Sequence, residues 1–171
     1  MSRSDNIPLP EPLAYFLTWT TYGSWLPGDE RGWTKRKKGA RLPDPERKSA
    51  AAKRMCEAPC VLDGDQRGIV ESTVARHCGL RGWALHAINC RTNHVHVVLT
   101  AARMHPDDVR DQLKAWCTRK LRELEVARIG PRLNLLRKRW WTEKGSSRFI
   151  NDEDSLEAAV TYVHDRQDRV R

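Results

Sequence analysis

An alternating segment near the middle of the chain, Asn93 to Leu99, constrains the fold most strongly. It reads Asn-His-Val-His-Val-Val-Leu, and a run so rich in β-branched and apolar residues is typical of a buried β-strand. Successive side chains of a strand point to opposite faces, so His94 and His96 share one face while Val95 and Val97 share the other. Two imidazoles placed in this way can chelate one divalent ion. The alternative is a pair of structural histidines without a ligand.

Further strands and helices are expected on both sides of this strand. The short link between residues 88 and 94 favours a hairpin that joins it to a strand at 83–88. Periodicity and capping residues also predict a strand at 14–20, helices at 65–79, 107–124 and from Asp154 or Ser155 onward, and a strand–turn–strand at 140–150. The resulting order is β-α-β-β-α-β-α. It indicates an α+β sandwich with a mainly antiparallel sheet and helices on one face.

Positive charge is concentrated in one part of the chain. The net charge is +9 over 171 residues, and residues 31–54 alone hold ten Lys or Arg against two acidic residues, a local net charge of +8. We interpret residues 31–60 as a mobile basic insertion in a single domain at 13–171, preceded by a flexible, proline-rich arm at 1–12. A balance this basic favours nucleic acid as the partner. The alternative is a solubilising surface.

Composition excludes some classes of protein. No apolar run approaches the roughly 20 residues of a membrane span, and the N-terminus lacks the apolar core of a signal peptide, so we expect a cytoplasmic protein with no membrane partner. The five cysteines are an odd number, which argues against a disulfide framework. A zinc site drawn from Cys56, Cys60, His77 and Cys78 is an alternative, although their spacing is not a strong zinc pattern.

A tyrosine on the last predicted helix offers a nucleophile. Tyr162 lies at the edge of the apolar stripe of that helix, where the alternative is a boundary residue with its hydroxyl in water. A phenolic oxygen beside a metal-bound phosphate can attack phosphorus and leave a covalent intermediate. If the metal is bound by imidazoles and is Mg²⁺ or Mn²⁺, an oxygen ligand and water should complete its shell.

These residues resemble a known family. Asn93 to Val98 is similar to the His-hydrophobic-His motif of the HUH single-tyrosine transposases, which include the REP-associated tyrosine transposases and the enzymes of the smallest bacterial insertion sequences. The resemblance covers about residues 12–167 and implies a ferredoxin-like fold with a divalent ion, Mg²⁺ or Mn²⁺, on His94 and His96. It also implies that Tyr162 cleaves single-stranded DNA near hairpins through a 5′-phosphotyrosine link, and that the free 3′-OH permits rejoining. Such a protein would bind the nucleoid and can act as a homodimer.

The third metal ligand departs from the family pattern. Relatives commonly carry Gln or Asn four residues after the tyrosine, where this chain has Arg166, a cation with no acceptor. Gln167 lies about 100° further around an ideal helix, and a frayed last turn would bring it to the metal. We choose Gln167 as the third ligand and keep Asp165 as the alternative.

Basic and aromatic residues in two segments are candidate DNA contacts. Lys and Arg neutralise phosphates, and tryptophans stack on unpaired bases, although strand alternation favours one indole of the pair Trp140 and Trp141 in the core. The lysine-rich stretch is alternatively a solvated loop. The candidates are Lys35, Arg36, Lys37, Lys38, Arg137, Lys138, Arg139, Trp140, Lys144 and Arg148.

Three functions are therefore open on the sequence. The first is a metal-dependent DNA strand transferase that uses Tyr162. The second is a module that binds structured DNA without cutting it, and the third is a nuclease in which the ion activates water.

Overall fold

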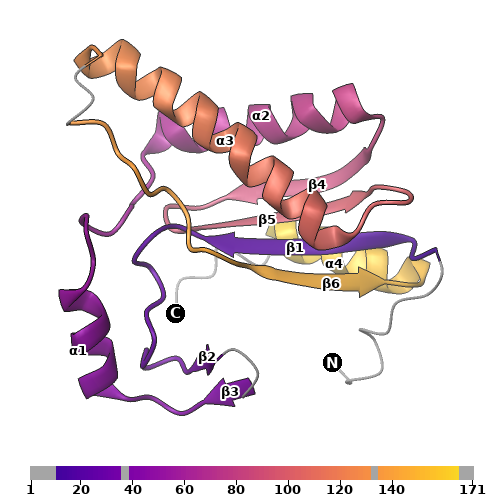
Figure 1. Cartoon of the computed structure of the whole chain (residues 1–171). Helices are drawn as coiled ribbons and strands as arrows, with labels where there is room; N and C mark the ends of the chain where they lie inside the picture. Colours follow the sequence, from indigo (N-terminus) through magenta and orange to yellow (C-terminus); the bar gives the residue numbers. More distant parts are fainter. Residues whose placement is uncertain (1–10, 36–38, 132–134, 166–171) are drawn as a thin grey trace.

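A four-stranded antiparallel sheet forms the centre of the protein (Figure 1). The computed structural model describes residues 11–35, 39–131 and 135–165. Strand β1 (Ala14–Thr20) pairs with β5 (His94–Thr100) on one side and with β6 (Ser146–Ile150) on the other, and β4 (Ala84–Cys90) pairs with the outer edge of β5. The expected α+β architecture with an antiparallel sheet is confirmed.

Helices α2 (Gly64–Arg81) and α3 (Pro106–Ile129) cover one face of this sheet. Each follows a sheet strand and leads to the next, so the chain runs β1-α2-β4-β5-α3-β6, the βαββαβ order of a ferredoxin-like fold. Both helices extend beyond their predicted ends.

Helix α4 (Glu153–Asp165) packs on the opposite face, so the expectation that all helices lie on one face is wrong. The reason is that the central strands are apolar on both faces. Phe16 and Val98 point away from α2 and α3, and they are covered by Ala159 and Val163 of α4. A two-faced apolar sheet needs a layer on each side to remove its side chains from water.

The ends of these helices follow standard capping. A capping box between Asp63 and Gln66 starts α2, and Gly82 in the left-handed conformation, at φ +67°, ends it. The backbone N–H of Ser155 donates to the Asp152 carboxylate at 2.7 Å, so the cap of α4 is Asp152 and not Asp154 or Ser155. Helix α4 therefore begins two or three residues earlier than predicted.

The described part of the insertion is folded, so a mobile segment is the wrong description of it. It contains a short hairpin of β2 (Trp33–Lys35) and β3 (Gly39–Arg41) and helix α1 (Pro45–Lys53). Helix α1 buries no residue, which explains why apolar periodicity did not reveal it. Arg36, Lys37 and Lys38 lie outside the described residues, as do residues 1–10 of the predicted arm.

None of the helices in the described ranges is long and apolar enough to cross a membrane.

The segment that leads into β6 is held by a buried lysine. Lys114 of α3 donates from Nζ to the backbone oxygens of Thr142, Glu143 and Lys144 at 2.8, 3.1 and 3.2 Å. A single bridge between Thr21 and Trp141 and then β6 replace the expected strand–turn–strand. Burial costs a cation its hydration, and three carbonyl oxygens replace that hydration here.

Gly145 follows directly and fits only because it lacks a side chain. A β-carbon there would overlap the backbone oxygen of Thr18 and stand 2.9 Å from Cδ of Arg110. We expect Gly145→Ala to lower the free energy of unfolding by about 1–3 kcal/mol through overpacking, measured by urea denaturation.

Gly68, exposed inside α2 with no atom within 4 Å of an added β-carbon, is the matched control. Gly68→Ala should raise the free energy of unfolding by roughly 0.5–1 kcal/mol, because alanine favours a helix interior. Equal effects of the two substitutions would contradict the close packing at Gly145.

Candidate functional site

The structure brings the two histidines and the tyrosine into one cavity of about 270 Å³. The ring centroids of His96 and Tyr162 lie 5.8 Å apart, and those of His94 and His96 lie 4.8 Å apart. The cavity is bordered by β1, β5, the loop after β1 and α4. Its lining residues are Thr18, Thr20, Ser24, Trp25, Arg31, Asn93, His94, His96 and Tyr162.

The register between β1 and β5 and the position of Tyr162 on α4 explain why these side chains lie together. In the pairing of β1 with β5, Thr18 lies opposite His96 and Thr20 opposite His94, so all four side chains occupy one face. Tyr162 lies beside the buried stripe of α4 on that same face, with its ring 6.0 Å from Phe16 and 41% of its surface exposed. The phenol is therefore supported from one side and accessible to a ligand.

Hydrogen bonds orient both imidazoles. Nδ1 of His94 lies 2.7 Å from Oδ1 of Asn93, and Nδ1 of His96 lies 2.9 Å from the hydroxyl oxygen of Thr18. When Nδ1–H donates in both bonds, each Nε2 keeps its lone pair for a metal ion. Donation from His94 is required by the acceptor character of the Asn93 oxygen.

The electrostatics keep both rings neutral at pH 7. Burial, together with repulsion from the nearby His94, lowers the pKa of His96 to about 4. Burial lowers the pKa of His94 too, with added repulsion from Arg91 and Arg31. Only neutral imidazole can bind a metal ion, so the site does not need to lose a proton first.

The donor set fits a divalent ion in part. Among the described residues no third His, Cys, Asp or Glu joins the pair, and Asp165 is exposed at the end of α4. Gln167 and Arg166 lie outside the described residues, so the choice of Gln167 stays a prediction. Two imidazole nitrogens suit Mn²⁺ and later metals better than Mg²⁺, which prefers oxygen ligands and keeps several waters.

The predicted DNA contact of Trp140 is wrong, because Trp140 is only 2% exposed. It belongs to the core shared by α2 and α3. Trp141 is half-buried and donates from Nε1 to the backbone oxygen of Lys114 at 3.2 Å and to the hydroxyl of Thr118 at 3.0 Å. The buried Trp140 ring therefore offers no free face for a base.

The basic residues among the predicted DNA contacts lie in different parts of the structure. Arg137 donates to the backbone oxygen of Ala58 at 3.0 Å and therefore anchors the insertion, while Lys138, Arg139 and Lys144 are exposed. Arg148 lies over the ring of Phe16 at 5.3 Å, on the face of the sheet that carries the cavity. Lys35 belongs to the hairpin of the insertion.

Arg31 is a cavity residue that sequence reasoning missed. Its Nε donates to the Asp29 carboxylate at 2.7 Å, a second donor reaches the backbone oxygen of Ser24 at 2.8 Å, and its guanidinium lies 4.6 Å from the Trp25 ring centre. Asp29 is buried and also pairs with Lys48 of α1 at 3.3 Å. The sequence signal that could have identified Arg31 was an aspartate inside a basic, glycine-rich turn.

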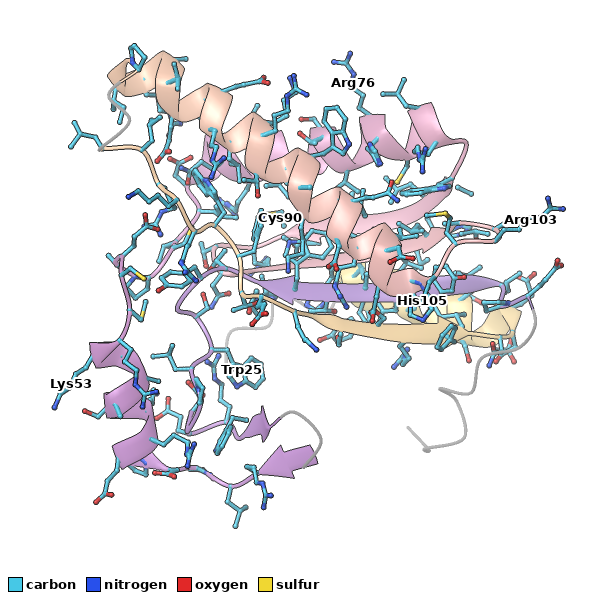
Figure 2. The ribbon with its side chains drawn as sticks, in the orientation of Figure 1. Trp25, Lys53, Arg76, Cys90, Arg103 and His105 are labelled. Carbon is cyan, nitrogen blue, oxygen red and sulfur yellow. The ribbon has the colours of Figure 1, made fainter. Side chains whose placement is uncertain are left out.

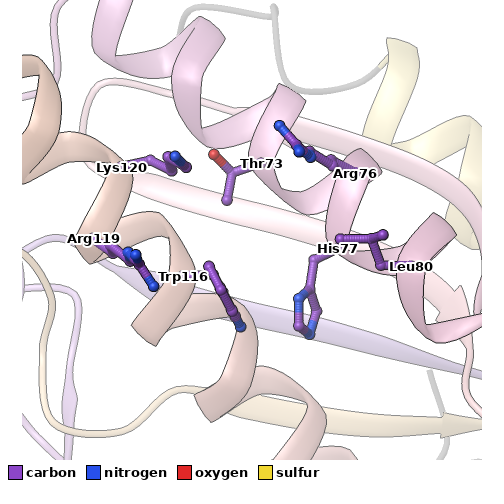
Figure 3. A pocket seen from close by; sticks show the side chains of 7 residues that line it. All are labelled: Thr73, Arg76, His77, Leu80, Trp116, Arg119 and Lys120. Carbon is purple, nitrogen blue, oxygen red and sulfur yellow. The ribbon is translucent and has the colours of Figure 1, made fainter.

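A separate cleft of about 210 Å³ lies between α2 and α3, away from His94 and His96 (Figure 3). It carries Trp116 and His77 with exposed cations around them, and no tyrosine. The proposed cysteine site does not form. All five cysteines are free, and no metal-binding group of three includes them in the described ranges.

A known structure shares this fold. A REP-associated tyrosine transposase bound to a REP hairpin matches with a TM-score of 0.52 and 12% identity, over 95% of this chain and 70% of that chain. The chain therefore shares its fold with that protein. A candidate transposase from Deinococcus radiodurans R1 matches with a TM-score of 0.48 and 15% identity, over 98% of each chain. No protein-family profile and no curated protein sequence matches the chain.

The buried carboxylate of Asp29 provides a test of how Arg31 is held at the edge of the cavity. Hydrogen bonds from Arg31, and then from Lys48, hold its pKa below the ordinary value. We expect Asp29→Asn to lower the free energy of unfolding by roughly 1–3 kcal/mol at pH 7, measured by urea denaturation.

The sign of the pH dependence follows from the depressed pKa. The stabilisation is complete above the unfolded-state pKa of about 3.9 and is lost as the pH falls through the folded-state pKa. The difference between wild type and Asp29→Asn should therefore shrink in acid. The exposed Glu157→Gln is the control and should change little; a difference that stays constant down to low pH would contradict the assignment.

Proposed function

We propose that this protein is a DNA strand transferase that cleaves single-stranded DNA beside a hairpin and uses Tyr162 as its nucleophile. The observation that carries the proposal is the shared cavity, in which the Tyr162 phenol stands against His96 with both imidazole Nε2 atoms available. The fold adds support, since a transposase of the same fold has been seen with a REP hairpin. A site built only for packing would not place a partly exposed phenol beside two oriented imidazoles that line an open cavity.

The reaction exchanges one phosphate ester for another. The Tyr162 oxygen forms a bond to phosphorus, the bond from phosphorus to the 3′ oxygen of the preceding nucleotide breaks, and the phenolic proton ends on that 3′ oxygen. The DNA downstream of the break stays on the tyrosine through its 5′ phosphate, as a phosphodiester, and the upstream DNA ends in a free 3′-OH. Attack by another 3′-OH reverses the step, so rejoining needs no external energy.

The residues around Tyr162 hold the DNA for this attack. His94 and His96, with Gln167 as third ligand, would bind Mg²⁺ or Mn²⁺, which polarises the phosphate and neutralises charge in the transition state. Arg31 borders the cavity and Arg148 lies on the same face of the sheet, where their guanidinium groups can contact the flanking phosphates. Thr18 and Asn93 keep the two imidazoles in position.

A covalent adduct tests the nucleophile. Wild-type protein is incubated with end-labelled hairpin DNA from the flanks of its gene and Mn²⁺, denatured, and separated on a gel. We expect a protein–DNA adduct in the wild type, and none with Tyr162→Phe or with His94→Ala, because one lacks the attacking oxygen and the other a metal ligand.

Tyr22→Phe is the matched control, because Tyr22 does not line the cavity and its hydroxyl accepts a backbone N–H of Cys56 at 3.2 Å. It should form the adduct normally. DNA cleavage that persists in Tyr162→Phe would instead identify a nuclease that uses water. Tight hairpin binding with no adduct under any condition would identify a binding module.

Metal affinity tests the roles of the histidines and of their hydrogen-bond partners. In calorimetric titration with Mn²⁺, His94→Ala should abolish binding, and Thr18→Val should weaken it by about 10–100-fold because His96 loses the group that orients it. Thr20→Val is the control, since Thr20 borders the same cavity but bonds to Thr142.

The same titration examines the third ligand. Gln167→Ala should weaken Mn²⁺ binding and Asp165→Asn should not. The reverse result would move the third ligand to Asp165. Wild-type affinity in His94→Ala would remove the metal site from the proposal.

A further inference from the structure

Two cavities of the protein share a wall. Beside the catalytic cavity lies another of about 410 Å³, formed by the β2–β3 hairpin and the turn before it, and Trp25 and Arg31 line both. Figure 2 shows Trp25 between the central sheet and the hairpin. The second cavity continues to Trp33 and Arg41. A ligand that leaves the histidine site across Trp25 therefore enters this second cavity directly.

Backbone bonds hold both indoles of this surface in place. Nε1 of Trp25 donates to the backbone oxygen of Gly32 at 2.8 Å, and Nε1 of Trp33 donates to that of Leu42 at 2.9 Å. Their one polar group is thus satisfied by the protein itself. What remains at the surface is the ring, and Trp25 is 45% exposed. Trp33 is half-buried. Rings fixed at the surface in this way suit a stacking partner more than a hydrogen-bonding one.

A guanidinium accompanies each ring. Arg31 lies 4.6 Å from the centre of the Trp25 ring, and Arg47 of α1 lies 5.0 Å from that of Trp33. A base that stacks on either indole thus brings its phosphate beside a cation. Aromatic rings alternating with cations along a groove are the features that bind unpaired nucleic acid.

Close contacts and ion pairs also tie this surface to α1. A β-carbon on Gly28, at φ +93°, would overlap the backbone oxygen of Asp44, so the turn and the start of α1 lie in direct contact. Buried Asp29 joins Arg31 to Lys48 of α1. The spacing between the two indoles is therefore set before any ligand binds, which lowers the entropic cost of ordering a strand on them.

We propose that Trp25, Arg31, Trp33 and Arg47 form a track for unpaired DNA, which we call the tryptophan track. The strand attacked at Tyr162 continues across Trp25 into the second cavity, with a base on each indole. This proposal rests on the proposed function for its choice of nucleic acid. In this proposal the basic insertion holds the single strand next to the scissile phosphate, and it does not hold the stem of the hairpin.

The test measures binding without cleavage. Full-length protein in chelator is titrated into labelled oligothymidylate and into a labelled blunt duplex, and affinity is read by fluorescence anisotropy. We expect Trp25→Ala and Trp33→Ala each to weaken oligothymidylate binding by roughly 5-fold or more, because stacking contributes about 1–3 kcal/mol per base. Duplex affinity should not change, and Trp33→Phe should recover part of the loss.

Trp116→Ala is the matched control. Trp116 is 40% exposed and has Arg119 at 5.2 Å from its ring centre, but it lies in the cleft between α2 and α3 (Figure 3). It should bind oligothymidylate as the wild type does. An equal loss in Trp116→Ala, wild-type affinity in both track variants, or equally effective competition by polyglutamate would overturn the proposal.

The two proposals fail separately. If no adduct forms with metal but the track variants lose affinity for the single strand, the track stands and cleavage by Tyr162 falls. If the adduct forms and the track variants bind oligothymidylate normally, cleavage stands and the track falls. Circular dichroism and thermal unfolding of each variant confirm that it is folded.

Discussion

The antiparallel register between β1 and β5 is the constraint on which both the core and the candidate site depend. It places Leu17 and Trp19 with Val95 and Val97 on the face covered by α2 and α3. The same register places Thr18 opposite His96 on the other face. A slip by one residue would exchange the two faces, burying the imidazoles under α3 and exposing the valines. Stability and the geometry of the site are therefore set by one pairing.

Buried charges fix the loops on either side of the cavity. Asp29 holds Arg31 and Lys48, and Lys114 holds three successive carbonyl groups before β6. Each is a costly group to remove from water, and each is satisfied by several partners. The loops that carry Trp25 and that lead to Arg148 are thus positioned by charge, while the sheet beneath them is positioned by apolar packing. Rigid walls of this kind suit a site that must orient a long, flexible ligand.

The elements with strong periodicity were predictable and the insertion was not. Valine-rich β5 and the apolar stripes of α2 and α3 follow from side-chain spacing alone. Helix α1 has no buried residue, so its only signals were the Asp44 cap and a run of alanines. Trp140 was also misplaced. Strand alternation favoured burial of one indole of the pair Trp140 and Trp141, and the structure buries Trp140, with Arg137 over its ring at 6.0 Å.

By itself the sequence determined that His94 and His96 share a strand face, that a tyrosine lies at the margin of a later helix, and that the excess charge lies in one segment. These are local properties, set by the two-residue repeat of a strand and by the 3.6-residue repeat of a helix. Only the tertiary structure decided that α4 crosses to the second face of the sheet and brings Tyr162 against His96, and that the insertion extends the cavity past Trp25. Both depend on which distant surfaces bury one another, and spacing along the chain carries no information about that choice.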